Sequence, residues 1–350
     1  MMREKIENIL RAALEFKASD IHLTVGVPPI FRINGEIKRY GKDILLPADT
    51  EEIAKITIPE NMYDLFKEKG ELDYSYGIPG VSRFRVNAYH QRKSVSLALR
   101  VVASKTPTIE ELDLPKIIPE LVERPQGLIL VTGPTGSGKS TTLASMIDYV
   151  NRTMRKHIVT LEDPIEYLHK HGNSIIDQRE VGFDTQSYAN GLKGALRQDP
   201  DIILVGEMRD LETIGIAITA AETGHLVLGT LHTSSAPSTI NRIIDVFPPA
   251  QQPQIRVQLA SVLVGVISQR LFPTVDKKGR KAATEILVNN PAIANLIRNE
   301  KIHQIQSTMQ TSRAQGMHTL EMSIRDLIDR NLIQKEAANK YLQEKMMLDG

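Results

Sequence analysis

The sequence predicts an α/β protein in which helices cover a parallel β-sheet. A small α+β domain precedes this core, and a mainly helical region follows it. In the middle of the chain, continuous apolar runs alternate with amphipathic helical stretches, as in a sheet buried on both faces. The first hundred residues instead contain short alternating runs joined by turns. Four prolines separate the two regions: Pro107, Pro115, Pro119 and Pro125.

The composition excludes several classes of protein. The chain has 350 residues, which is enough for two domains. Its 43 Lys and Arg against 42 Asp and Glu give a net charge of +1, so no overall positive charge favours nucleic acid as a partner. The absence of cysteine excludes disulfides, thiolate metal sites and cysteine catalysis.

No segment of the sequence has the pattern of a signal peptide or a membrane span. Charged residues between Arg3 and Glu7 interrupt the first apolar stretch, which reads as an amphipathic helix. The most apolar stretch elsewhere, Val262–Ile267, is far shorter than the roughly 20 residues that cross a bilayer. We therefore expect the protein to be cytoplasmic.

The N-terminal region predicts a helix followed by short strands. From Ile21 to Val25, apolar and polar residues alternate, as in a strand with one buried face. Asn34-Gly35 lies between two short alternating runs and indicates a tight hairpin turn. A second hairpin is expected between the alternating runs 84–88 and 95–101.

The middle of the chain predicts the α/β core. Apolar residues from Leu143 to Val150 recur at helical spacing, and Asp210 can cap a helix that Gly224 ends. The predicted core strands are residues 128–131, 157–161, 202–205 and 226–228.

Beyond residue 240 the pattern becomes helical. An apolar stripe from Ile255 to Val266 predicts one helix, and Asp276–Gly279 predicts a hairpin turn. The expected organisation is a domain at 1–105, a proline-rich linker at 106–126, the core at 127–240 and a mainly helical region at 241–350.

Residues 133–140 match the phosphate-binding pattern G-x-x-x-x-G-K-[ST], between an apolar run and an amphipathic helix as the pattern requires. The glycines let backbone N–H groups surround phosphates, Lys139 can reach the β- and γ-phosphates, and Ser140 can bind Mg²⁺. We therefore predict that the chain binds ATP and Mg²⁺. The predicted nucleotide-binding residues of this loop are Gly133, Pro134, Thr135, Gly136, Ser137, Gly138, Lys139, Ser140 and Thr141.

Hydrolysis also needs an acidic group at the end of a neighbouring strand. Glu207 follows the apolar run 202–205 and is the candidate for polarising the attacking water. Gly206 stands where an aspartate is common in such strands.

Three more acids follow the apolar run 158–161, at the strand end where ligands of open α/β sheets bind. Glu162, Asp163 and Glu166 are therefore candidates for holding Mg²⁺ or for orienting the attacking water. The alternative is that these acids stabilise a helix N-terminus.

Four basic side chains are further candidates. His225 and His232 flank the last core strand, where the alternative role is packing at a strand end. Arg85 and Arg100 lie at the polar positions of N-terminal strands, where the alternative is a solvated strand face.

Four motifs occur along the chain in this order: Gly133–Ser140, Thr160–Glu166, Gly206–Asp210 and Gly224–Thr233. In this set and order, the sequence resembles the secretion ATPase superfamily, and most closely its type IV pilus retraction ATPases. Three segments extend the resemblance over nearly the whole chain, two in the PAS-like domain of that family and one after its core: Ser19–Leu23, Arg83–Asn87 and Asn241–Pro248.

The resemblance implies a RecA-like core with an N-terminal PAS-like domain, a hexameric ring and ATP bound between subunits. It implies that Arg85 and Arg100 reach the phosphates of a neighbouring subunit, and that His225 contributes to the nucleotide site. The residues implied in catalysis are Glu207, Lys139, His232, Glu162, Glu166, Arg85 and Arg100, with Ser140 and Asp163 at the metal.

We predict an ATP-driven motor that retracts type IV pili. Its expected partners are further copies in a homo-hexamer, an inner-membrane platform protein at the cytoplasmic face of the membrane and, indirectly, the pilin fibre. No nucleic acid is expected. One alternative is a pilus assembly or type II secretion ATPase, although these usually carry an extra N-terminal domain and often a four-cysteine module.

Two alternatives come from other classes. A nucleic-acid translocase is disfavoured because only 5% of the residues are aromatic and none is Trp, which leaves few platforms for stacking bases. A nucleotide-gated adaptor would bind ATP without turnover.

The segment Ala292–Asn299 resembles one that is typical of the retraction ATPases and departs from it at Ala294 and Asn299. Asn290 and Pro291 can start a helix there, whose apolar residues share one face. We expect residues 295–298 to couple hydrolysis to the pilus machinery, and the alternative is plain core packing.

Overall fold

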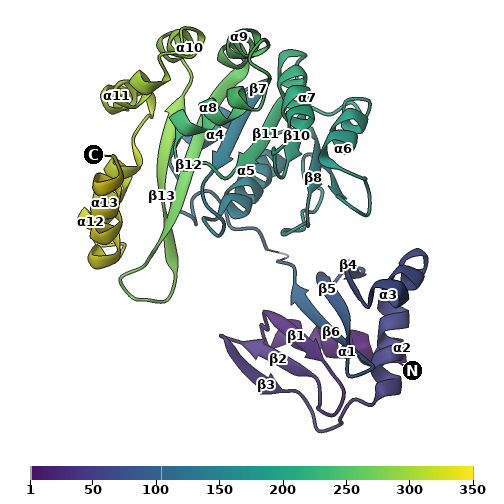
Figure 1. Cartoon of the computed structure of the whole chain (residues 1–350). Helices are drawn as coiled ribbons and strands as arrows, with labels where there is room; N and C mark the ends of the chain where they lie inside the picture. Colours follow the sequence, from purple (N-terminus) through teal and green to yellow (C-terminus); the bar gives the residue numbers. More distant parts are fainter. Residues whose placement is uncertain (1, 104, 350) are drawn as a thin grey trace. The chain divides into compact units, whose positions relative to one another are not determined.

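The computed structural model of the chain describes residues 2–103 and 105–349 (Figure 1). Contacts between residues divide it into two units. The N-terminal unit comprises residues 1–105 and 166–168, and the C-terminal unit comprises residues 106–165 and 169–350.

The N-terminal unit is built on a six-stranded antiparallel sheet with the order β3-β2-β1-β6-β5-β4. Apolar side chains of the strands and of three helices form its core, because every second strand residue points to the helices. The elements are α1 (Met2–Glu15), β1 (Asp20–Leu23), β2 (Ile30–Ile33), β3 (Glu36–Arg39), α2 (Pro47–Thr57), a 3₁₀ turn (Glu60–Met62), α3 (Tyr63–Lys69), β4 (Glu71–Ile78), β5 (Ser82–Gln91) and β6 (Ser94–Val101).

Both hairpins predicted in the N-terminal unit are confirmed. Asn34 (φ 52°) and Gly35 (φ 86°) join β2 to β3, and Arg92 (φ 48°) and Lys93 (φ 62°) join β5 to β6. A pair of positive-φ residues gives a two-residue loop whose twist matches that of the strands.

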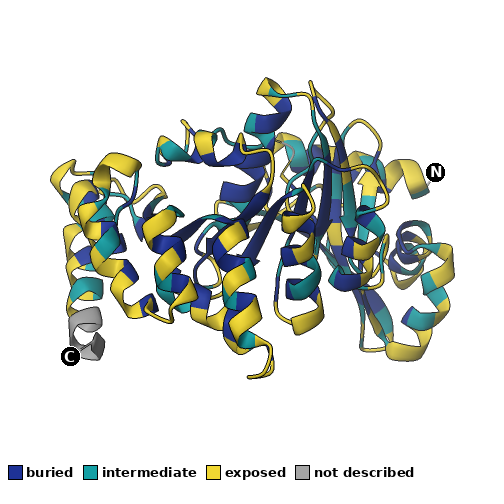
Figure 2. Ribbon diagram, turned by 90° about the horizontal axis from the view of Figure 1, so that it is seen from above, coloured by how far each residue is buried: buried dark blue, intermediate teal, exposed yellow. Residues whose placement is uncertain are grey.

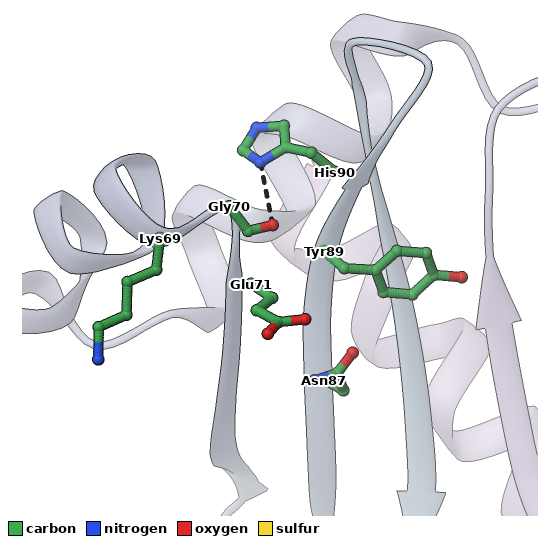
Figure 3. A pocket seen from close by; sticks show the side chains of 6 residues that line it. All are labelled: Lys69, Gly70, Glu71, Asn87, Tyr89 and His90. Carbon is green, nitrogen blue, oxygen red and sulfur yellow. Dashed lines mark hydrogen bonds between the residues drawn. The ribbon is translucent and has the colours of Figure 1, made fainter.

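The junction of α3 and β4 forms an open hollow on the surface of this unit (Figure 3). Gly70 ends α3 in the left-handed conformation, with φ 80°. His90 Nδ1 lies 3.2 Å from Gly70 O, and the imidazole stacks on Phe66 with the ring centroids 4.8 Å apart. These contacts hold the start of β4 against the end of β5.

The C-terminal unit is built on a seven-stranded sheet with the order β13-β12-β7-β11-β10-β8-β9. Its strands are parallel except β13, which is antiparallel to β12. The elements of the sheet and its connections are α4 (Ile117–Val122), β7 (Gly127–Thr132), α5 (Lys139–Thr153), β8 (His157–Glu162), β9 (Ile175–Glu180), α6 (Tyr188–Ala195), β10 (Ile202–Val205), α7 (Leu211–Glu222), β11 (Leu226–Leu231), α8 (Ala236–Asp245), α9 (Gln252–Val262), β12 (Leu263–Pro273) and β13 (Arg280–Val288).

The central strands β7, β10 and β11 are buried along their whole length, and Figure 2 shows buried strands in dark blue beside helices that expose one side. One core lies between the sheet and α6 to α9, and a second lies between the sheet, α4 and α5. The prediction of an α/β fold with a buried parallel sheet is therefore confirmed. The predicted cap is also present, since Asp210 accepts a hydrogen bond from Thr213 N at 2.8 Å.

Beyond residue 240 the hairpin predicted at Asp276–Gly279 is confirmed, because β12 and β13 pair across it, but one predicted helix is partly wrong. The helix expected from Ile255 to Val266 ends at Val262, and Leu263 starts β12, which pairs with β7. Apolar residues at consecutive positions fit a buried strand as well as a helix, and pairing along β7 selects the strand. Strand β9 was not predicted, because its sequence is mostly polar.

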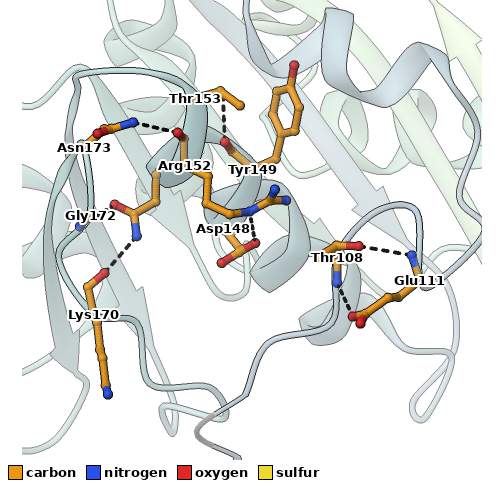
Figure 4. Close-up of polar contacts among 10 residues, drawn as sticks. Thr108, Glu111, Asp148, Tyr149, Arg152, Thr153, Lys170, Gly172 and Asn173 are labelled. Atoms are coloured by element: carbon orange, nitrogen blue, oxygen red, sulfur yellow. Dashed lines mark hydrogen bonds and ion pairs between the residues drawn. The ribbon is translucent and has the colours of Figure 1, made fainter.

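The expected linker packs on the C-terminal unit. Ile109, Leu114, Ile118 and Leu121 are buried in the same core as α5. At its start, Thr108 and Glu111 exchange backbone-to-side-chain hydrogen bonds of 2.9 and 3.1 Å (Figure 4).

Polar contacts hold the carboxyl end of α5 to the loop that leads to β9 (Figure 4). Arg152 Nε donates to Asp148 Oδ2 at 2.7 Å, and Asn173 Nδ2 donates to Arg152 O at 2.6 Å. Asn151 Nδ2 donates to Lys170 O at 2.8 Å. The helix that begins with Lys139 is thereby fixed at its far end.

Helices complete the C-terminal unit. They are α10 (Pro291–Arg298), α11 (Ile305–Thr311), α12 (Leu320–Asp329) and α13 (Lys335–Asp349), with 3₁₀ turns at Ile302–Gln304 and Arg313–Gln315. In the described part of the chain, no helix is both long and apolar enough to span a bilayer.

Candidate active site

Most of the predicted site residues of the C-terminal unit gather at one edge of its sheet. The parallel strands β7, β8, β10 and β11 all end there, and the register pairs Thr132 with Leu231 and Val205 with Leu161. The loop at 133–138 follows β7, and acidic residues follow β8 and β10. This is the edge at which ligands of parallel α/β sheets bind.

The glycine-rich loop has the backbone that its sequence requires. Gly133, Gly136 and Gly138 have φ values of 143°, 77° and 89°, which favour glycine over residues with a side chain. Lys139, the first residue of α5, donates from Nζ to Gly133 O at 2.9 Å and to Pro134 O at 3.2 Å. The lysine therefore lies across the loop, at the positive end of a helix.

The acids after β8 have different surroundings. Glu162 Oε1 accepts hydrogen bonds from Thr160 Oγ1 at 2.6 Å and Gln178 Nε2 at 3.0 Å. Asp163 is exposed, so its carboxylate is available to a ligand. Glu166 is also exposed but belongs to the N-terminal unit. The structure therefore brings Glu162 and Asp163 to the sheet edge.

Glu207 lies between two basic side chains. His232 Nε2 is 2.9 Å from Glu207 Oε1, and Arg209 Nε donates to the same carboxylate. That hydrogen bond raises the pKa of Arg209 above its usual value. The three side chains, with Thr233 and Arg242, line a cavity of about 360 Å³. The carboxylate therefore faces an open space in which a water molecule can be held.

The structure gives a physical reason for Gly206. A Cβ atom at this position would lie 3.0 Å from Leu161 O and 3.1 Å from Tyr188 Oη, which is closer than side-chain atoms normally pack. An aspartate there would displace the tyrosine or the neighbouring strand.

Tyr188, the first residue of α6, is a site residue that the sequence did not indicate. Burial raises the pKa of its hydroxyl, and the charges of Asp163, Glu207 and Glu162 raise it further, so the group stays protonated. A single tyrosine at a helix start carries no motif, so only the fold reveals its position among these acids.

One predicted residue lies at the opposite edge of this sheet, and two belong to the N-terminal unit. His225 precedes the amino end of β11, where its Nδ1 is 3.0 Å from Ala220 O, whereas His232 follows the carboxyl end. Arg85 and Arg100 are cross-strand neighbours on the exposed face of the N-terminal sheet. Within the C-terminal unit, the structure therefore does not bring His225 together with the glycine-rich loop.

Arg100 is held by an acid of its own unit. Its Nε donates to Asp20 Oδ1 at 3.0 Å. Burial raises the pKa of Asp20, but the hydrogen bonds from Ser19 and Arg100 outweigh it and lower the pKa overall. The guanidinium is still 71% exposed, so it remains open to a further anion.

The oxygen donors at the sheet edge suit a hard cation. Within residues 2–103 and 105–349, no three His, Asp or Glu side chains are close enough to hold a metal ion by themselves. Mg²⁺ at nucleotide sites instead takes one or two protein ligands and completes its shell with phosphate oxygens and water. The hydroxyl of Ser140 and the exposed carboxylate of Asp163 fit that description.

Comparison with known proteins gives consistent matches over nearly the whole chain. The type IV pilus retraction ATPase PilT of Pseudomonas aeruginosa is 46% identical over 335 residues, which cover 96% of this chain and 97% of the relative. A twitching motility protein of Neisseria gonorrhoeae is 47% identical over 315 residues, 90% of this chain and 84% of the relative.

A solved structure matches equally well. The crystal structure of the pilus retraction motor PilT with bound ADP is 50% identical in sequence, superposes with a TM-score of 0.87 and covers 94% of both chains. A family profile described as type II/IV secretion system protein matches residues 1–348. The chain therefore belongs to the family of type II/IV secretion system proteins.

Proposed function

We propose that this protein is an ATP-hydrolysing hexameric motor that powers the retraction of type IV pili. The observation that carries the proposal is the position of the Glu207–His232 pair at the same sheet edge as the glycine-rich loop. Near-full-length identity to the retraction ATPase named above supports the direction of movement.

The loop residues from Gly133 to Thr141 bind the phosphates of ATP through backbone N–H groups, and Lys139 neutralises phosphate charge. On binding, the Nζ of Lys139 exchanges its carbonyl partners in the loop for phosphate oxygens. Ser140 and Asp163 hold Mg²⁺, which supplies positive charge to the phosphates when it is bound.

Glu207 polarises the attacking water, and His232 orients the carboxylate. Glu162 contributes a second negative charge at the sheet edge, held in place by Thr160 and Gln178. An acid and a basic partner at one reaction centre are typical of general acid–base catalysis.

Arg85 and Arg100 complete the site of a neighbouring subunit. They belong to a different unit from the loop, and both side chains are exposed. In the proposed hexamer the arginines of one chain reach the phosphates bound by the next. Glu166 takes part in catalysis, and His225 contributes to the nucleotide site.

Movement follows from hydrolysis. A change in the nucleotide alters the angle between the PAS-like domain at 1–105 and the RecA-like core, across the segment 106–126. A ring that binds an inner-membrane platform protein at its cytoplasmic face passes this motion to the pilus base, where pilin subunits are removed.

Deletion of the gene in the source bacterium tests the proposal. Cells that keep surface pili but no longer twitch support retraction, and cells that lose all pili support the alternative role in assembly. Complementation with the Lys139→Ala variant separates nucleotide-dependent work from a structural role, because the proposal requires this variant to fail.

A further inference from the structure

Strand β12 runs beside β7 and places one buried amide against the glycine-rich loop. Gln269 is 3% exposed. Its Nε2 donates to Ser137 O at 2.6 Å, and its Oε1 accepts from Thr142 Oγ1 at 2.9 Å. One side chain thus bridges the last part of the loop and the first turn of α5.

The partners determine which way the amide faces. A carbonyl oxygen can only accept a hydrogen bond, so the NH₂ group of Gln269 must face Ser137 O. The amide oxygen then faces the hydroxyl of Thr142, which donates. Both halves of the amide are used, and neither a carboxylate nor an apolar side chain of the same size can make both contacts.

The loop passes Gln269 so closely that there is no room for a side chain at position 133 and little room at position 138. A Cβ atom at position 133 would collide with Gln269 O, and a Cβ atom at position 138 would lie 3.1 Å from Gln269 Nε2. The strand therefore forms a wall along the loop from Gly133 to Gly138.

Such a wall adds to the contacts that Lys139 makes with the carbonyls at the start of the loop. Glycine backbones lose more conformational entropy on ordering than others do. Ser137 Oγ is buried and has no hydrogen-bond partner among the described residues, so this side chain does not tether the loop. The phosphate-binding N–H groups need to be fixed before the ligand arrives, because a preorganised site binds more tightly.

We propose that Gln269 is a positioning residue that holds the glycine-rich loop in its nucleotide-receptive form and thereby sets the affinity for ATP and ADP. It acts through Ser137 and Thr142. The inference deepens the proposed function and rests on its nucleotide site.

The first test compares two substitutions of the same type in the full-length protein. Gln269→Met keeps the size of the side chain and removes both hydrogen bonds. We expect the Kd for ADP and the KM for ATP to rise about tenfold, which corresponds to the loss of about 1.4 kcal/mol, with kcat changed much less. The control is Gln258→Met, which removes the hydrogen bond from Gln258 to Glu222 between α9 and α7 and leaves ADP binding unchanged.

The second test uses pH. In Gln269→Glu, the ionised carboxylate cannot donate to Ser137 O, so ADP binds more weakly than to the wild type at pH 8. Burial raises the pKa of a carboxyl group, and once protonated its O–H replaces the amide donor. The ratio of variant to wild-type affinity should therefore recover as the pH falls, whereas the ratio for Gln269→Met stays constant.

The outcomes separate the inference from the proposed function. Failure of the wild type to bind ADP contradicts the proposed function. If the wild type and Gln269→Met bind ADP equally tightly, and the affinity of Gln269→Glu does not recover at low pH, the inference is overturned. The proposed function is not affected by that result.

If Gln269→Met does not fold, Thr142→Val is compared with Thr142→Ser, which keeps the hydroxyl. Weaker binding confined to Thr142→Val supports the inference, and equal binding overturns it.

Discussion

His232 Nε2 lies 2.9 Å from Glu207 Oε1, and the two residues follow the carboxyl ends of the adjacent strands β11 and β10. The pair joins two motifs that are separated along the chain. Variants of these two residues can therefore test which side chain acts on the water and which one orients its partner.

Replacing Glu207 by Gln should abolish turnover and spare binding. The side chain keeps its size and loses its charge, so we expect ADP affinity within a few fold of wild type and phosphate release at least about 10²-fold slower. Glu212→Gln is the matched control, because Glu212 forms an ion pair with Lys193 on the surface. Equal phosphate release by Glu207→Gln and wild type would remove Glu207 from the mechanism.

His232 should depend on Glu207 for its effect. We expect His232→Gln to slow phosphate release, and the double variant with Glu207→Gln to be no slower than Glu207→Gln alone. Residues that act as a unit give such non-additive losses. Independent, multiplying losses in the double variant would mean that the histidine has a separate role.

Arg100 should act on the nucleotide of a neighbouring subunit. Arg100→Ala and Glu207→Gln subunits are each expected to be inactive, and mixed rings should regain phosphate release, because some sites combine the intact half of each. Arg39→Ala, on the exposed strand β3, is the control and should keep wild-type activity. Mixed rings that form and stay inactive would contradict action between subunits.

Asp113 should make the stability of the C-terminal unit depend on pH. Its Oδ2 accepts hydrogen bonds from Lys281 at 2.8 Å and Arg330 at 3.0 Å. The hydrogen bond from Lys281 lowers its pKa, burial opposes this, and the charges of Lys281 and Arg330 lower the pKa further. A lowered pKa in the folded state means that the stabilisation is complete at neutral pH and is lost as the pH falls below about 4.

Asp113→Asn should accordingly lower the melting temperature by about 1–3 °C at pH 7, a small effect because the carboxylate is partly exposed to solvent. The difference from the wild type should shrink below pH 4. The control is Asp329→Asn, on α12, for which we expect the same melting temperature as the wild type. A difference that grows with acidification would contradict the assignment.

The exposed side of α10 should couple hydrolysis to movement. Ile293, Ala294 and Ile297 are buried and account for the packing of the helix, while Leu296 is half-buried and Arg298 is exposed. We expect the double variant Leu296→Ala/Arg298→Ala to keep phosphate release and ring assembly and to lose twitching motility. Ile297→Ala is the comparison, since it should lower stability by about 2–5 kcal/mol. Parallel loss of all three properties in the double variant would assign the segment to core packing.

The parts of this protein that could be predicted from its sequence are those that local patterns determine. The loop Gly133–Ser140 and the hairpin at Asn34-Gly35 need particular residues at fixed spacing, so the residues themselves indicate the backbone. The buried strands were visible because they are apolar on both faces.

Other features depend on contacts between distant residues. The stretch around Val262–Ile267 suits a helix or a strand, and only its pairing with β7 decides. Gln269 and Tyr188 have no motif, and their roles follow from partners such as Ser137, which is 132 positions from Gln269.

The order of the sheet has a consequence for synthesis. Strand β7, which leads into the glycine-rich loop, pairs with β11 and β12, and both neighbours come roughly 100 or more residues later in the chain. While the ribosome is still making those residues, β7 has no native strand partner and its apolar side chains lack their native cover. Non-local pairing of this kind slows folding and leaves strand edges open to aggregation. A growing chain therefore carries the complete glycine-lysine motif well before the later strands can cover the strand that precedes this motif.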